Sequence, residues 1–126
     1  MRHMESDKFL FDTYAILEII EGNEHYKKYL NSRIIINDFI FAELCFTLFR
    51  KGHPKAKELI NDYRQLIIHA PSKAIEIAMQ FRIEEKKRSL SIPDCISYVM
   101  AKELGIKFLT GDKEFKNLDG VEFVPK

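Results

Sequence analysis

Four acidic residues stand where short apolar segments end or where helices begin. Asp12 follows the run KFLF, Asp112 follows the run KFLT after one glycine, and Asp94 comes directly after a proline. Glu43 is the one charged residue within the aromatic segment FIFAELCFTLF. Carboxylates that are gathered together raise one another's pKa, and a divalent cation removes this conflict. Oxygen ligands without a nearby His or Cys suit Mg²⁺ or Mn²⁺ rather than zinc.

Each acid also has a structural interpretation. Asp12 suits the N-cap of a helix, Asp94 suits a first helical turn, and Asp112 suits a turn or cap. Glu43 is harder to explain in this way, because an unpaired carboxylate among apolar neighbours is costly to bury. The nearest basic residue further along its helix is Arg50, about two turns away. We therefore expect a compensating positive charge to reach Glu43 from elsewhere.

The segments between these acids alternate between predicted strands and helices. Continuous apolar or β-branched runs indicate strands, and amphipathic segments opened by Asp, Asn or Pro indicate helices. Strands are expected at 8–11, 33–36, 66–69, 107–110 and 121–124. Helices are expected at 13–21, 24–30, 38–51, 54–65, from 71 to about 88, and 93–104.

Apolar strands that alternate with amphipathic helices are typical of a parallel sheet covered on both faces. The sequence thus predicts one α/β domain over residues 1–126, with a parallel four- or five-stranded sheet and helices on both faces. Residues 1–3 look like a cloning remnant and carry no fold argument. Open parallel sheets bind ligands at the carboxyl ends of their strands. All four acids can reach that edge.

Composition sets broad limits. With 46% hydrophobic and 31% charged residues among 126, the chain is an ordinary globular protein. It has neither an apolar run long enough for a membrane helix nor a secretory signal, and we expect a cytoplasmic protein. Cys45 and Cys95 match no metal spacing and are expected to be buried free thiols. The net charge of +1 does not decide on nucleic acid, although residues 50–88 carry ten Lys and Arg against five Asp and Glu.

Three segments resemble the acidic signatures of the PIN domain family. They are FDTYAILEI around Asp12, FAELCFTLF around Glu43, and IPDCISYVMAKELGIKFLTGDKEF with Asp94 and Asp112. A PIN domain of this length is similar to the VapC-type toxins of VapBC toxin–antitoxin pairs. The resemblance implies a Mg²⁺- or Mn²⁺-dependent endoribonuclease that forms a homodimer and binds a small antitoxin protein. It also implies that the four acids are catalytic metal ligands and that Thr110 is a catalytic hydroxyl residue beside them.

The implied chemistry is metal-assisted hydrolysis of RNA, with Asp94 or Asp112 helping to deprotonate the attacking water. Thr13 is a further hydroxyl candidate of the same kind as Thr110. Some relatives carry another acid in the region of Ser97, where this chain has none, so one or two metal ions remain open. Basic residues of the middle segment are expected to hold RNA phosphates. The candidates are Lys51, Arg82, Lys86 and Lys87.

The sequence also bears on functions other than that of a toxin nuclease. A receiver domain of two-component signalling needs an acidic pair after its first strand, whereas this chain has Asp12-Thr13 there. A PIN domain can also serve as a catalytically weak binding module, or as a nuclease in RNA maturation or on DNA. The aromatic side chains of residues 39–49 have two explanations, core packing or a surface for a second copy or an antitoxin. They are Phe39, Phe46 and Phe49.

Overall fold

Four short apolar strands form the centre of the molecule. The computed structural model describes residues 7–125, so the expectation for residues 1–3 lies outside the described part of the chain. The strands are β1 (Lys8–Phe11), β2 (Arg33–Ile35), β3 (Lys107–Thr110) and β4 (Val121–Phe123). They form one parallel sheet in the order β2-β1-β3-β4, with Leu10 of β1 opposite Ile35 and Phe108. The predicted parallel α/β fold is confirmed.

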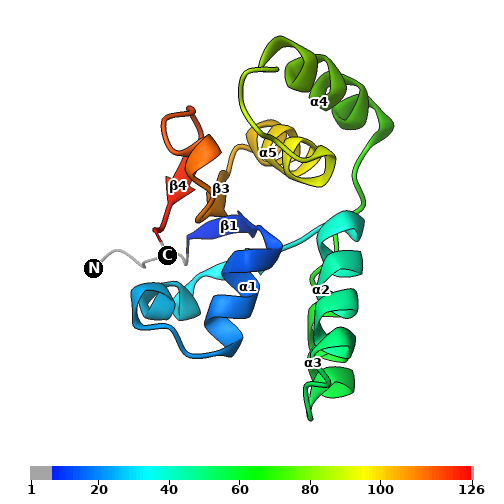
Figure 1. Ribbon diagram of the computed structural model, residues 1–126, viewed down its shortest axis with the longest axis vertical. Coiled ribbons are helices and arrows are strands. Elements are labelled where there is room, and N and C mark those ends of the chain that lie inside the picture. The colour runs from blue at the N-terminus through cyan, green and yellow to red at the C-terminus, as the bar shows by residue number, and fades with distance from the viewer. Residues whose placement is uncertain (1–6, 126) are drawn as a thin grey trace, which may run out of the picture.

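Helices cover both faces of this sheet, as Figure 1 shows with α1 on one side of β1 and α5 on the other. The α-helices are α1 (Thr13–Ile20), α2 (Asp38–Arg50), α3 (Ala56–Arg64), α4 (Ser72–Glu84) and α5 (Ile92–Leu104). Two 3₁₀ helices are η1 (Glu24–Asn31) and η2 (Lys113–Phe115). Helix α4 packs on α5 rather than on the sheet. None of these helices is long and apolar enough to cross a membrane.

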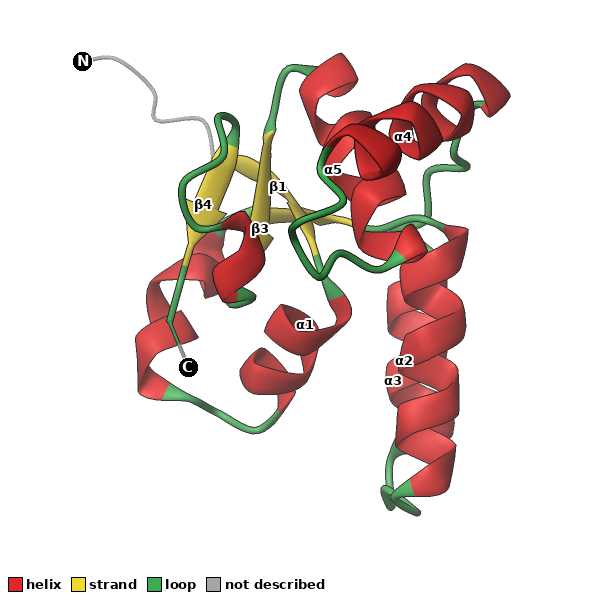
Figure 2. Cartoon of the chain, turned by 45° about the horizontal axis from the view of Figure 1, so that its top comes forward, coloured by secondary structure: helices red, strands yellow, loops and turns green. Residues whose placement is uncertain are grey.

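Helices α2 and α3 form an antiparallel pair that extends away from the sheet (Figure 2). Leu44 and Leu48 of α2 and Ile60 of α3 are buried, while other faces of the pair meet solvent. Glu43 is exposed, so the fold does not carry the cost of burying an unpaired carboxylate. Phe46 and Phe49 are 65% and 56% exposed, which agrees with the view that one small core does not hold all the aromatic residues of α2.

The strand predicted at residues 66–69 does not form. Ile67 makes only an isolated parallel bridge with Ile36, where the Ile68 amide donates to the Ile36 carbonyl over 2.8 Å. Pairing stops there because the backbone enters α2 directly after Ile36, with Asn37 as the N-cap of that helix. The sheet therefore has four strands, the lower of the two numbers predicted.

The cysteines are both free thiols. Cys95 is fully buried in α5, as predicted, whereas Cys45 is only partly buried because it lies on the protruding α2. Burial raises the pKa of both thiols, and the raised pKa of Cys95 is about 11. Neither thiol is therefore activated for chemistry.

Candidate functional site

Asp12 lies at the carboxyl end of β1 and is 4% exposed. Its Oδ1 accepts a hydrogen bond of 2.7 Å from the Ala15 amide and so caps α1, and its Oδ2 accepts one from the Thr110 hydroxyl. The pKa of Asp12 is raised to about 7, mainly by burial and to a smaller extent by the charges of Asp94 and Asp112, while the two hydrogen bonds lower it. Asp12 is thus a helix cap and a perturbed acid at once.

Thr110 connects two of the acids. Its side chain is fully buried at the end of β3, and its hydroxyl donates to Asp12 while accepting from the Asp112 amide over 3.0 Å. Asp112 in turn accepts from the Glu114 amide over 3.0 Å and caps η2. This chain of hydrogen bonds fixes the ends of β1 and β3 relative to each other.

Gly111 lies between Thr110 and Asp112, and close packing rather than an unusual backbone angle explains it. A Cβ atom there would lie 2.9 Å from the Val124 carbonyl oxygen and 3.0 Å from the Tyr26 hydroxyl. The Tyr26 hydroxyl itself donates to that carbonyl over 3.0 Å. Any side chain at position 111 would push the Asp112 loop away from the sheet.

Asp94 lies in the first turn of α5, where the Ser91 hydroxyl accepts a hydrogen bond of 3.2 Å from its amide. The pKa of Asp94 is raised to about 6, first by burial and then by the negative charge of Glu43, while a hydrogen bond from Ser91 lowers it. The charges of Asp94 and Asp112 raise the pKa of Asp12, and those of Glu43 and Asp112 raise the pKa of Asp94, so the acids of the site lie close enough to affect one another.

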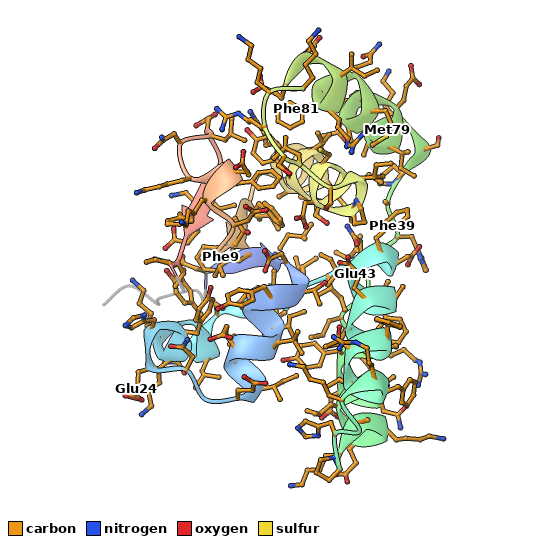
Figure 3. All side chains as sticks on the ribbon, viewed as in Figure 1. Phe9, Glu24, Phe39, Glu43, Met79 and Phe81 are labelled. Carbon is orange, nitrogen blue, oxygen red and sulfur yellow. The ribbon has the colours of Figure 1, made fainter. Side chains whose placement is uncertain are left out.

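Glu43 reaches the same region from α2, and Figure 3 shows it on the part of α2 that lies near the sheet. Its partner is the Thr13 hydroxyl, which donates to Glu43 Oε1 over 2.8 Å. None of the ion pairs among residues 7–125 includes Glu43. The expectation of a compensating positive charge is therefore wrong, and the partner of Glu43 is a neutral hydroxyl. Exposure explains why no cation is required, since water solvates this carboxylate.

All four acids line one pocket of about 770 Å³ at the carboxyl edge of the sheet. Sequence reasoning missed much of the remaining wall, which includes three aromatic side chains. The other lining residues are Thr13, Tyr14, Phe46, Thr47, Gly111, Lys113, Glu114, Phe123 and Pro125. One signal was available, because Phe46 and Thr47 follow Glu43 by three and four residues and so share its helix face.

The donor chemistry of this pocket fits a hard divalent cation, since it offers carboxylate oxygens and no His or Cys. The distances between the acids fit a metal site less well than their chemistry does. Among residues 7–125, no three Asp, Glu, His or Cys side chains are grouped so that they could hold a metal ion. One carboxylate oxygen of Asp12 and one of Asp112 accept the hydrogen bond of a helix cap. Repulsion between the four negative carboxylates also keeps them apart. The four predicted ligands therefore share a pocket without forming a closed coordination shell.

A parallel β2-β1-β3-β4 sheet with acids from four separate elements at its carboxyl edge defines a class of acidic α/β domains. The chain belongs to the PIN domain family, whose model matches residues 9–121. This match covers the three acidic segments in which the resemblance was seen. No curated protein sequence is similar enough to count as a match.

Solved structures share the fold at low sequence identity. A toxin–antitoxin complex from Klebsiella pneumoniae has a TM-score of 0.78 and 21% identity, covering 94% of this chain and 98% of the other. VapC20 of Mycobacterium tuberculosis, a toxin that cleaves the sarcin–ricin loop, has a TM-score of 0.73 and 20% identity, covering 94% and 100%. VapBC2 of Rickettsia felis, bound to a promoter DNA fragment, has a TM-score of 0.73 and 18% identity, covering 94% and 98%.

Proposed function

We propose that this protein is a Mg²⁺- or Mn²⁺-dependent endoribonuclease and the toxin of a toxin–antitoxin pair. The observation that carries the proposal is one pocket lined by carboxylates from four elements, at the edge where parallel sheets bind ligands. Within it, neighbouring negative charges help to raise the pKa of Asp12 and of Asp94. PIN family membership and the likeness to toxin structures support it. The substrate is RNA, and the site of action is the cytoplasm.

The proposed metal ligands are Asp12, Glu43, Asp94 and Asp112. When bound, a divalent cation would neutralise phosphate charge and make water a better nucleophile. Asp94 is the proposed proton acceptor for that water, because it lines the pocket and, unlike Asp12 and Asp112, its carboxylate caps no helix. Thr110 holds Asp12 in place, and Thr13 does the same for Glu43.

The direct test is single-turnover cleavage of a structured RNA by wild type and by Asp94→Asn with Mg²⁺ present. Loss of most of the rate is expected, because the substituted amide cannot accept a proton. A matched control is Asp119→Asn, since Asp119 is exposed and lies outside the pocket. Cleavage by Asp94→Asn at the wild-type rate would remove Asp94 from the mechanism.

The partners belong to the same proposal. Exposed apolar side chains on α2 and α4, with Phe49 at 56% and Ile83 at 72%, offer surfaces for a second copy and for a small antitoxin. Light scattering of the purified chain tests the homodimer. Co-expression with the product of the adjoining gene tests the antitoxin, because capture of a small DNA-binding protein would favour a toxin over a maturation nuclease.

One observation favours a different function, a PIN domain that binds nucleic acid with little cleavage. It is the open spacing of the acids, which form no ready metal group among the described residues. A Mg²⁺ titration monitored by calorimetry separates the two functions. Saturable Mg²⁺ binding that Asp12→Asn abolishes favours the nuclease, and RNA binding without Mg²⁺ binding favours the module.

A further inference from the structure

Helix α2 presents one row of functional groups toward the pocket. Phe46, Thr47 and Arg50 follow Glu43 by three, four and seven residues, which places all four on one face of the helix. The first three line the pocket. The Arg50 guanidinium lies over the Phe46 ring, 5.5 Å from its centroid. The row thus runs from an acid to an aromatic ring to a cation.

Phe46 is the unusual member of this row. Its side chain is 65% exposed, although it stands in a pocket with four acids. An exposed phenylalanine adds nothing to core packing, and its ring is the only large flat apolar surface that α2 contributes to the described pocket wall. The cation–π contact with Arg50 places a positive charge beside the aromatic ring.

We propose that Phe46 is a platform on which one base of single-stranded RNA stacks, with Arg50 contacting a neighbouring phosphate. The inference rests on the proposed nuclease function and names the residue that positions its substrate. A nucleotide joins a phosphate to a flat base, so a strand whose phosphate reaches the acids must place a base within the same pocket. Stacking on aromatic rings accepts every base, because each has a π face.

A protein segment is the competing occupant of an exposed aromatic ring. The observations favour RNA, because Phe46 shares its pocket with the acids proposed for phosphate chemistry and its ring is paired with a cation. Phe49 provides the internal comparison. It lies on the same helix with a similar exposure of 56%, but it does not line the pocket. An RNA platform requires Phe46 and not Phe49, whereas a broad apolar docking face would use both.

The test uses the absence of tryptophan from the sequence. Phe46→Trp and Phe49→Trp each introduce a single fluorophore, and Asp94→Asn in the same chain prevents cleavage. The probe is a mixed-sequence single-stranded RNA of about twelve nucleotides. Saturating RNA should quench Trp emission in Phe46→Trp and leave Phe49→Trp unchanged. In parallel, Phe46→Ala should weaken RNA binding about tenfold relative to Phe49→Ala, with Phe46→Tyr retaining affinity.

The outcomes separate this inference from the nuclease proposal. Quenching confined to Phe46→Trp supports the platform even if wild type fails to cleave RNA, in which case the nuclease proposal alone falls. Unchanged emission in Phe46→Trp while filter binding shows bound RNA overturns the platform. Equal RNA affinities of Phe46→Ala and Phe49→Ala also overturn the platform. No RNA binding by any variant overturns both proposals.

Discussion

The two walls of the acidic pocket are built to different degrees of order. The sheet wall holds Asp12 and Asp112 through the buried Thr110, and each acid also caps a helix. The helix wall holds the exposed Glu43 through one hydrogen bond from Thr13. Carboxylates are therefore held in place and partly shielded from water on the sheet wall, whereas the carboxylate of the helix wall is solvated. Preorganised charge comes from the sheet, while the helix wall can adjust to what enters.

The largest difference between the walls should appear in catalysis. Asp12→Asn should lower the single-turnover rate of RNA cleavage about a hundredfold or more, since even indirect partners of a metal ligand contribute about ten- to a hundredfold. Asn still caps α1, so the fold is retained. Glu43→Gln should cost less, because its solvated carboxylate can be replaced in part by water. A greater loss in Glu43→Gln than in Asp12→Asn would contradict the comparison.

The walls should also differ in how their acids affect stability without metal. Burial raises the pKa of Asp12 from 3.8 to about 7, so the folded protein binds a proton that the unfolded chain releases. This contribution is fully present below pH 3.8 and is lost as the pH rises through about 7. Asp94, with a pKa of about 6, acts in the same direction. The melting temperature in EDTA should therefore fall as the pH rises from about 4 to about 7.

Asp12→Asn should reduce this fall and raise the melting temperature at about pH 7 and above. Glu43→Gln should change the profile less, because it removes only one of the charges that raise the pKa of Asp94. Added Mg²⁺ should stabilise wild type at the higher pH, by about 2.7 kcal/mol when its concentration is a hundred times Kd. The same addition should do little for Asp12→Asn. A flat profile in wild type would show that the buried acid does not strain the fold.

Two threonines make a matched pair across the walls. Thr110→Val leaves the Asp12 carboxylate without its donor and the Asp112 amide without its acceptor, and should cost about 1–3 kcal/mol in the free energy of unfolding. Thr13→Val removes one bond to an exposed acid and should change stability by less than about 0.5 kcal/mol. Urea unfolding measures both. Thr110→Ser should restore most of the loss, since it keeps the hydroxyl.

The sequence was sufficient for the sheet wall and insufficient for the helix wall. Asp12 and Asp112 follow apolar runs, and the end of a parallel strand has a known place in the fold. The position of Asp94 after Pro93 likewise marks a helix start. Glu43 could not be judged in this way, because apolar residues occupy several faces of α2 and no period shows which face is solvated. Its exposure depends on how α2 and α3 pair, which is a tertiary property.

Two further differences have the same origin. Residues 66–69 have the composition of a strand, but only Ile67 pairs, through one isolated bridge with Ile36. Composition alone therefore predicted a strand that does not form. A glycine directly after a strand suggests a sharp turn, whereas Gly111 is required by the nearby carbonyl of Val124, a residue distant in the sequence. In both positions a contact between distant segments decides the outcome, and local patterns carry no record of it.

The smallest expected effect concerns a brace behind the sheet wall. Arg88 donates from Nη1 to the Glu114 carbonyl over 2.8 Å and from Nε to Glu85 Oε1 over 2.7 Å. This joins the loop after α4 to η2, whose amide at Glu114 also binds Asp112. Arg88→Gln should lower the free energy of unfolding by under about 1 kcal/mol, as the ion pair is partly exposed.

Hydrogen exchange at the Glu114 amide should nevertheless accelerate in Arg88→Gln, because η2 loses a constraint on one side. Lys87→Gln removes the same charge from the neighbouring exposed position and should leave that amide unchanged. Equal exchange in both variants would mean that the sheet wall is ordered by Thr110 and its helix caps alone.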